Sequence, residues 1–292
     1  MKKVYLFLII PVLSLCLFGC ENKELKEKYD HGVKLIENKE WERATTVFKD
    51  LGDYKDSKDK LNEIIFLSST ETIDEHIDYP GLYGDDIKKG IKNLLSILKY
   101  KNTKSKVDEY YNKIIGKLDD EKNVPNSEQK DYSGNFYEYL EILEEYAYND
   151  NYKSQAKPKV CDYSIVAFNE GFINYTFSSN IKFHCEDSSF VTNNKYYKMT
   201  NHSWSGTRDV NRYSSYAYFV QFLTTNVMTY EETYISIYGT VPIQDSYWYK
   251  IIDDAIYVKK NRKEKYEKKF VITTLNDTTL KFKGYNYTLN VM

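Results

Sequence analysis

The spacing of apolar residues changes about halfway along the chain. In the first half they recur every three or four positions, as at Ile87, Ile91 and Leu94, which places them on one face of a helix. In the second half the apolar stretches are short, alternate with polar residues and end at turn-forming pairs. The pattern predicts an α+β protein, with a helical domain first and an antiparallel β barrel or sandwich after it.

Six helices are expected in the first half, separated by breaks rich in Gly, Asn and Asp. The composition changes near Asn149 to Pro158. We therefore assign residues 20–150 to the helical domain and residues 151–160 to a linker. The predicted helices cover residues 25–36, 41–51, 57–77, 85–100, 104–118 and 134–148.

Residues 161–292 are expected to form the β domain. Asn169-Glu170-Gly171 has the composition of a hairpin turn, and Asp253-Asp254 and Asn276-Asp277 supply further tight turns. The predicted strands cover residues 164–168, 172–177, 181–185, 196–200, 216–223, 233–238, 247–252, 255–259, 270–275, 278–282 and 287–291.

Residues 1–19 have the parts of an export signal. Two lysines give a basic start, and Val4 to Phe18 is an apolar run shorter than the roughly 20 residues that a spanning helix needs. A small residue, Gly19, stands at the expected cut. An apolar leader of this kind is the signal of a lipoprotein, an ordinary cleaved signal or an uncleaved membrane helix.

Leu17-Phe18-Gly19-Cys20 resembles the lipobox of bacterial lipoproteins. In that family the cysteine thiol receives a diacylglyceryl group, and the cysteine becomes the first residue of the mature chain. The resemblance implies recognition through Leu17 and Gly19, cleavage after Gly19 and lipidation of Cys20. It places the protein at the cell membrane, lipid-anchored on the extracytoplasmic face.

Composition agrees with a folded protein. With 30 Tyr and 5 Pro the chain is no disordered wall spacer, and its wealth of Lys, Asn and Ile is typical of a Gram-positive, clostridial-type source. Residues 21–155 carry 22 basic and 30 acidic side chains, whereas residues 156–292 carry 17 and 13. Because their net charges have opposite signs, the two halves are expected to lie next to different molecules. Nucleic-acid binding is not expected.

Cys161 and Cys185 are the cysteines that remain after the leader and the lipobox. They lie 24 residues apart in predicted strands, so a cross-strand disulfide fits an exported chain, with buried thiols as the alternative. His184 precedes Cys185, but neighbours on a strand point to opposite faces. No Cys-x-x-Cys or His-Glu-x-x-His pair is present, so neither a metal nor a cofactor is expected.

Residues 24–62 carry the most informative internal motif. Trp41, Ala44 and Phe48 have helical spacing and precede the turn Leu51-Gly52-Asp53-Tyr54-Lys55-Asp56-Ser57, in which Asp53 or Asp56 can cap the next helix. The segment resembles the tetratricopeptide-like helical hairpin of exported and membrane proteins of Gram-positive bacteria. It is one copy, and a stacked array needs three or more. The hairpin either packs the helical domain or docks a protein partner.

From about residue 204 the chain resembles the lipocalin-like domains of small bacterial lipoproteins. The resemblance is carried by Trp204-Ser205-Gly206-Thr207, by Tyr249-Lys250-Ile251 before a two-Asp turn, and by residues 270–280. It implies a barrel, which either holds one small apolar ligand or fills its interior with side chains.

A basic segment joins two of the predicted strands. It is expected to contact anionic lipid head groups or wall polymers, at about 1 kcal/mol for each basic residue near such a surface. The alternative is a charged loop that discourages pairing of strand edges. Its basic residues are Lys259, Lys260, Arg262, Lys263, Lys265, Lys268 and Lys269.

No catalytic constellation stands out from the sequence. His202, Ser203 and Asp209 supply the residue types of a nucleophile triad, but no Gly-x-Ser-x-Gly elbow accompanies them. We expect a membrane-anchored lipoprotein that is not an enzyme and that binds a protein or a small ligand at the cell surface. A structural protein that organises the envelope and a cryptic wall-acting hydrolase are the alternatives.

Overall fold

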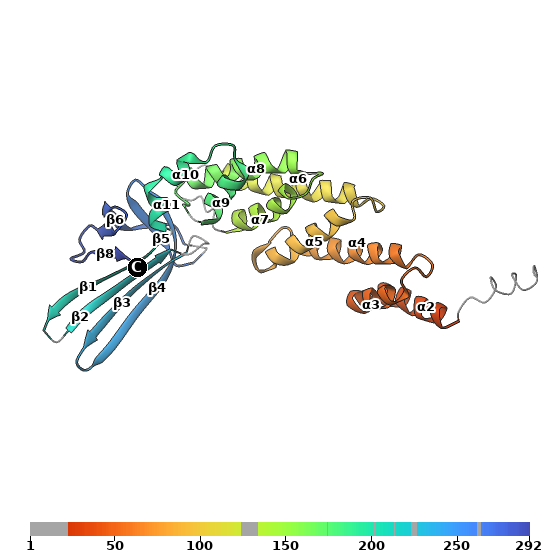
Figure 1. The fold of residues 1–292 in the computed structure, drawn as a ribbon, viewed down its shortest axis with the longest axis horizontal. Helices are drawn as coiled ribbons and strands as arrows, with labels where there is room; N and C mark the ends of the chain where they lie inside the picture. Colours follow the sequence, from red (N-terminus) through yellow and green to blue (C-terminus); the bar gives the residue numbers. More distant parts are fainter. Residues whose placement is uncertain are drawn as a thin grey trace, which may run out of the picture. The chain divides into compact units, whose positions relative to one another are not determined.

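The computed structural model describes residues 23–123, 134–173, 175–200, 202–212, 214–222, 227–261 and 264–292. The leader, with Leu17, Gly19 and Cys20, lies outside the described residues. Within those ranges, none of the helices has the length and apolar character needed to cross a membrane. The fold is α+β: helices come first, and the strands that follow form a closed antiparallel barrel (Figure 1).

Contacts between residues divide the chain into two compact units. One takes in residues up to Asp78 together with Lys89–Val107. The other takes in Tyr79–Lys88 and Asp108–Met292, and so combines helices with the barrel. The first two-thirds of the chain is helical, as the apolar spacing predicts for its first half. These helices are α2 (Lys23–Glu37), α3 (Trp41–Leu51), α4 (Ser57–His76), η1 (Gly81–Tyr83), α5 (Gly84–Ser96), α6 (Thr103–Lys122), α7 (Asn135–Ala147), α8 (Lys153–Asn169), α9 (Tyr175–His184), α10 (Ser189–Asn193) and α11 (Lys195–Thr200).

The six predicted helices are confirmed as α2 to α7, and the bounds of α3 are those predicted. Helices α2 and α3 pack closely because small residues lie between them. A Cβ added to Gly32 would come within 2.8 Å of the Phe48 ring, and Ala44 and Phe48 are fully buried. The first unit therefore has a core of its own below this hairpin, made of Leu35, Ala44, Phe48, Leu51 and Ile64.

The turn between α3 and α4 differs from the prediction in its aspartates. Gly52 has the expected positive φ of 57°, but the Asp56 side chain does not cap α4. Asp56 instead accepts a hydrogen bond from the Tyr29 hydroxyl, and Asp53 pairs with Lys58. The turn is thereby tied back to α2, a long-range contact that local sequence does not reveal.

The predicted linker at residues 151–160 and the predicted strands at 164–168, 172–177, 181–185 and 196–200 are wrong. Helix α8 runs through the linker, and α9 and α11 take the places of two strands. Val160, Ser164 and Ala167 are buried at helical spacing, and Gly171, with a φ of 92°, lies just past the helix end. Short apolar runs fit the spacing of a helix as well as that of a strand, and these segments were predicted as strands because their apolar runs are short. The β domain begins at Ser203 rather than at residue 161.

Tyrosines organise the packing of α6 against α8. The Tyr152 hydroxyl donates to Asp108 over 2.5 Å, and the Tyr163 hydroxyl donates to Asp119 over 2.8 Å. The two tyrosines are about three helical turns apart along α8, and the two aspartates have the same separation on α6. The two helices therefore stay in register. A buried tyrosine needs a hydrogen-bond partner, and the aspartates supply one.

Each strand of the barrel pairs antiparallel with the next, and β8 pairs with β1. The prediction for β5 is confirmed in its bounds, and those for β2, β6, β7 and β8 agree to within a few residues. Strand β1 was not predicted, and β3 and β4 begin well before their predicted starts. The strands are β1 (Ser203–Asn211), β2 (Ser214–Phe222), β3 (Val227–Ser236), β4 (Gly239–Ile252), β5 (Ala255–Lys259), β6 (Glu267–Leu275), β7 (Thr279–Phe282) and β8 (Leu289–Val291).

The barrel interior is filled with side chains. The buried cluster takes in Val220, Met228, Tyr249, Ile256, Phe270, Leu280 and Leu289 among others. Of the two expectations for a small barrel, an enclosed ligand or a packed interior, the structure shows packing at these positions.

One end of the barrel, which we call the closed end, is covered by the chain that precedes β1. Met199 of α11 belongs to the barrel core, and its carbonyl accepts the Trp204 indole N–H over 3.0 Å. A Cβ on Gly206 would lie 2.2 Å from the Thr288 carbonyl oxygen, so the Trp-Ser-Gly-Thr segment needs its glycine. At the same end the Tyr249 hydroxyl donates to the Ile173 carbonyl over 3.2 Å.

Candidate functional site

Strands β1–β4 run on beyond the rest of the barrel. Strand β1 pairs with β8 at Trp204 and Ser205, and β4 pairs with β5 over Trp248–Ile252. In the recorded pairings, residues 206–211 and 239–247 therefore have a strand on one side alone. Figure 1 shows the hairpin ends of these four strands extending past β6 and β8. We call this extension, residues 206–212, 214–218 and 230–247, the arm.

One face of the arm continues the barrel interior, and we call it the tyrosine face. Directly paired residues of antiparallel strands project to the same side. One row across the four strands is Arg208, Tyr216, Tyr234 and Val241, and the adjoining row is Gly206, Tyr218, Glu232 and Ile243. The row after that begins with Trp204 and Val220, which are core residues, so the same face leads from the core into solvent.

The rings of the tyrosine face contact one another. The centroids of Tyr216 and Tyr234 are 5.1 Å apart, and Tyr218 stacks on Tyr287 at 3.6 Å. Tyr218 and Tyr287 are buried, whereas Tyr216 and Tyr234 are half-buried and Tyr285 is 36% exposed. The rings of this face thus become more exposed from the barrel outward.

Aliphatic and cationic groups complete this face. Val241 and Ile243 are 59% and 60% exposed, and the Arg208 guanidinium lies 5.0 Å from the centroid of the Tyr216 ring. Aromatic rings and guanidinium groups are enriched at the hot spots of binding surfaces.

Polar groups meet where the arm joins the barrel. The Tyr247 hydroxyl donates to Asp245 over 2.5 Å, and the Lys260 ammonium lies 3.3 Å from the same carboxylate. The hydrogen bond from Tyr247 holds the pKa of Asp245 below its ordinary value. Burial, with Asp245 as hydrogen-bond partner, raises the pKa of Tyr247, so near neutral pH this pair is a carboxylate and a neutral phenol.

Beside these groups opens a cleft of about 740 Å³, which we call the lysine cleft. Lys269 donates to the Tyr247 hydroxyl, and burial lowers the pKa of Lys269. The cleft is lined by Tyr247, Val258, Lys259, Lys260, Glu264, Lys265, Glu267, Lys268 and Lys269.

The predicted basic patch is only partly an exposed surface. Lys260, Lys265, Lys268 and Lys269 are exposed, and Arg262 and Lys263 lie outside the described residues. Lys259 is buried, so its assignment to an exposed loop is wrong. It is the last residue of β5 and pairs with Trp248, which brings its ammonium over the Trp248 and Tyr266 rings at 5.5 and 4.8 Å.

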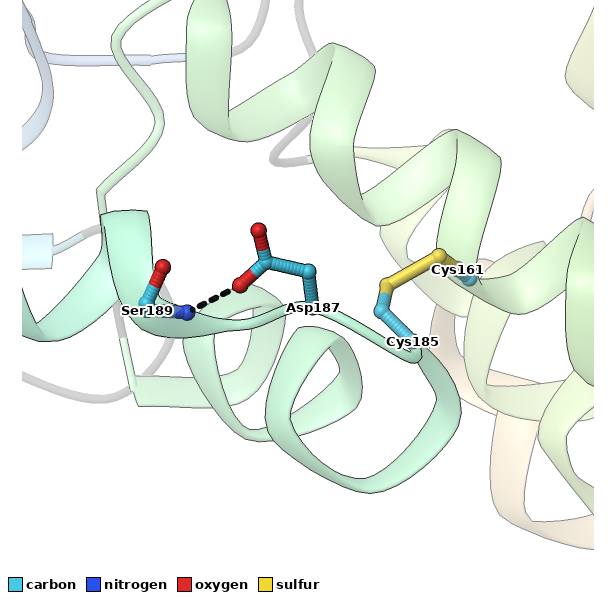
Figure 2. The surroundings of a disulfide bond; sticks show 4 residues. All are labelled: Cys161, Cys185, Asp187 and Ser189. Atoms are coloured by element: carbon cyan, nitrogen blue, oxygen red, sulfur yellow. Dashed lines mark hydrogen bonds between the residues drawn. A yellow bond between two sulfur atoms is a disulfide. The ribbon is translucent and has the colours of Figure 1, made fainter.

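Cys161 and Cys185 are bridged, with their Cα atoms 5.2 Å apart. Figure 2 shows the bond joining helix α8 to the end of α9, so the expectation of a cross-strand bridge is wrong. Just after it, Asp187 accepts the Ser189 backbone N–H over 2.9 Å, which lowers the pKa of Asp187. The bridge therefore fixes helices that lead into the closed end.

His184 is buried and pairs with the partly buried Glu144. Its Nε2 lies 3.1 Å from Glu144, which also accepts the Tyr148 hydroxyl over 2.6 Å. Burial favours the neutral acid, yet these hydrogen bonds hold the pKa of Glu144 below its ordinary value. Among the residues that the structure describes, no group of three or more His, Cys, Asp and Glu side chains is placed to hold a metal ion.

The triad residue types are not brought together. His202 and Ser203 stand at the start of β1, and Asp209 lies near its far end. At about 3.3 Å per residue, His202 and Asp209 are roughly 20 Å apart along one strand. These three residues form no triad in this fold.

The first unit carries a second cleft, of about 620 Å³, beside the hairpin of helices α2 and α3. Trp41, Leu61 and Ile65 line it together with Lys49 and Lys89. The Trp41 indole donates to Glu71 over 3.1 Å, outside the hairpin motif itself.

Sequence reasoning missed the tyrosine face, although a signal for it exists. Tyr216 and Tyr218, two residues apart, mark a strand that presents both rings on one side. Comparison of the chain with protein-family models, with curated proteins and with solved structures finds no match.

Proposed function

We propose that this protein is a lipid-anchored, extracytoplasmic binding protein that holds its ligand on the tyrosine face of the arm. The observation that carries the proposal is the outward continuation of the barrel's inner face, where Tyr216 and Tyr234 are half-buried and Tyr285 is exposed. A barrel interior packed with side chains favours an exposed site over an enclosed one. The proposal assigns no catalytic residue.

The chemistry of the face suits recognition. Tyrosine offers a large, rigid and amphipathic contact area at low entropic cost, and arginine is the cation most often found at binding hot spots. Exposed apolar side chains gather on the arm, with Val210, Ile237, Val241 and Ile243 each more than half exposed. Contiguous apolar patches on a protein surface typically mark interaction sites.

The face, rather than the strand edge, is the proposed contact. Pro242 lies in the part of β4 that pairs with β3 alone, and a proline has no N–H with which to pair an added strand at the other edge. Proline in this position is a common device against edge-to-edge association. A partner is therefore expected to bind through its side-chain or ring surfaces.

We also propose a tetratricopeptide-like assignment for the α2–α3 hairpin and a lipocalin-like assignment for the barrel. The close packing of α2 on α3 through Gly32 and Ala44 supports a tetratricopeptide-like hairpin. The eight antiparallel strands in sequential order support a lipocalin-like barrel. A role in organising envelope proteins is the second candidate, favoured by the mainly apolar cleft beside Trp41.

The anchor is tested on the protein in its own host. Cys20→Ala, or treatment with the lipoprotein signal peptidase inhibitor globomycin, is expected to abolish fatty-acid labelling of the chain and to change its membrane fractionation. Unchanged labelling and unchanged membrane retention in the variant would show that Cys20 is not the anchor.

Binding is tested with delipidated cell envelopes and the purified full chain in detergent. Saturable retention of the wild type is expected, with at least a tenfold loss of affinity in the Tyr216→Ala, Tyr234→Ala double variant. Tyr238→Ala is the matched control, because Tyr238 is 93% exposed at the β3–β4 turn and is not one of the tyrosine-face rings. Wild-type protein that does not bind, or equal losses in both variants, would refute the proposed function.

A further inference from the structure

The tyrosine face and the lysine cleft form one continuous track of contacts. The track runs from the arm to the barrel mouth, and each group lies within 6.1 Å of the next. Its members, in order, are Arg208, Tyr216, Tyr218, Tyr287, Tyr285, Phe270 and Lys269. Tyr218, Tyr287 and Phe270 are buried core rings that support the track from below, and a ligand would meet the half-buried or exposed members, which are Arg208, Tyr216, Tyr285 and Lys269. Accessible rings with a cation at each end suit an elongated ligand rather than a compact one.

From this arrangement we infer that the track binds an acidic polysaccharide whose sugar rings carry carboxylates. The inference rests on the proposed function and names the class of ligand for it. One face of a pyranose ring presents C–H bonds, which pack against the face of an aromatic ring. Tyr216, Tyr234 and Tyr285 are the half-buried or exposed rings of the track that could offer such faces.

The cations lie beside the rings rather than apart from them. Arg208 is 5.0 Å from the Tyr216 ring, and the Lys269 ammonium is 3.8 Å from the Tyr247 ring. A sugar that packs beside Tyr216 would bring its own carboxylate to Arg208, whereas at the buried Tyr247 ring the exposed Lys269 side chain is the group that a ligand would meet. The planar guanidinium can also meet a carboxylate through two hydrogen bonds.

The anions along the track suit hydroxyl groups. Glu232 lies in the same row as Tyr218, and Asp245 lies where the arm meets the barrel. Carboxylates only accept hydrogen bonds, and sugar hydroxyls can donate to them. The lysine cleft, with five lysines against two glutamates, then takes the acidic groups.

The same carboxylates argue against a nucleic acid, the other polymer that stacks on aromatic rings. Single-stranded nucleic acids combine stacking with a positive groove that follows a charge on every nucleotide. Glu232, Asp245, Glu264 and Glu267 would interrupt such a groove, and the whole chain carries a formal net charge of −2. A glycan with separate acidic groups meets the anions at its neutral hydroxyls.

The test is affinity electrophoresis of the full chain in detergent, in gels that contain polygalacturonate, neutral dextran or neither, with oligo(dT) binding measured in parallel. Retardation is expected in polygalacturonate and not in dextran. The affinity for polygalacturonate is expected to fall at least tenfold in two variants. One is the double variant Tyr216→Ala, Tyr234→Ala, and the other is the triple variant Lys260→Gln, Lys265→Gln, Lys268→Gln. Lys281→Gln is the control, because Lys281 is exposed on β7 and lines no part of the cleft.

Three outcomes would overturn the inference: equal retardation in dextran, tighter binding of oligo(dT) than of polygalacturonate, or lysine-cleft variants that bind like wild type. If envelopes retain the protein through the tyrosine face while polygalacturonate does not bind, the ligand class is wrong and the binding function stands. If envelopes do not retain it either, the proposed function fails as well.

Discussion

The two ends of the barrel use the same strands and the same kind of side chain to different effect. At the closed end, Trp204 and Tyr249 are buried and bond to the Met199 and Ile173 carbonyls of the preceding chain. At the arm end, Tyr216 and Tyr234 follow the same alternation but have no strand or helix over them in the described contacts. The lengths of β8 and β5, not the local sequence of β2 or β3, decide whether a ring is core or surface.

The largest expected effect is a difference in the free energy of unfolding between a variant at the closed end and a variant at the arm end. Trp204→Ala should lower the free energy of unfolding by about 3–5 kcal/mol, because it empties a core position and frees the Met199 carbonyl. Tyr234→Ala should cost only about 1 kcal/mol, since the ring is half-buried. Urea unfolding of both variants measures this, and equal losses would show that the arm end is as much core as the closed end.

The next effect concerns the helices that cover the closed end. Replacing both Cys161 and Cys185 by Ser should cost about 3 kcal/mol, the loop-closure value for a bridge over 24 residues. Envelope binding of the folded variant should be unchanged, because the bridge lies away from the arm. Wild type compared with and without reductant is the control. A variant as stable as oxidised wild type would refute the structural role of the bridge.

A smaller effect is expected from the partly buried carboxylate of Glu144. The folded-state pKa of Glu144 lies below its ordinary value of 4.5, so its contribution is present above that pH and is lost as the pH falls through the folded pKa. Glu144→Gln should therefore cost about 1.5–3 kcal/mol at pH 7, the range for hydrogen bonds to a charged group. The difference from wild type should shrink in acid. A difference that stays constant from pH 7 to pH 3 would contradict this assignment.

The smallest stability effects are expected at the lysine cleft. Lys265→Gln and Lys268→Gln should each change the free energy of unfolding by less than about 0.5 kcal/mol, as is usual for exposed positions. The same variants should weaken binding of the acidic glycan. Destabilisation well beyond this range would mean that these lysines support the barrel instead.

Long and strongly periodic elements were predictable from the sequence, and the strand-like helices were not. Helix α3 and strand β5 have the predicted bounds because their patterns end at clear breaks. Residues 164–185 were assigned to strands because their apolar runs are short, and only tertiary packing shows that α8 and α9 are helices. The Cys161–Cys185 pairing could be inferred from exclusion of the other cysteines, but the elements that carry it could not.

The candidate site was the least predictable part. The first half of β3 and the arm half of β4 mix polar and apolar residues, so residues 227–232 and 239–246 gave no strand signal. The tyrosine face depends on cross-strand register, which joins Tyr216 to Tyr234 and leaves both beyond β8. Lys259 was assigned to the exposed basic segment because its neighbours are charged, whereas pairing with Trp248 buries it.

Hydroxyl-radical footprinting of every tyrosine, read by mass spectrometry with and without envelope fragments, tests the difference between the two ends most directly. In free protein, Tyr216, Tyr234 and Tyr285 should be modified while Tyr249 is not. With envelope fragments present, those three should become protected and Tyr238 should stay reactive. Protection confined to other tyrosines, or no protection at saturating fragment concentration, would contradict the assignment of the arm as the binding surface.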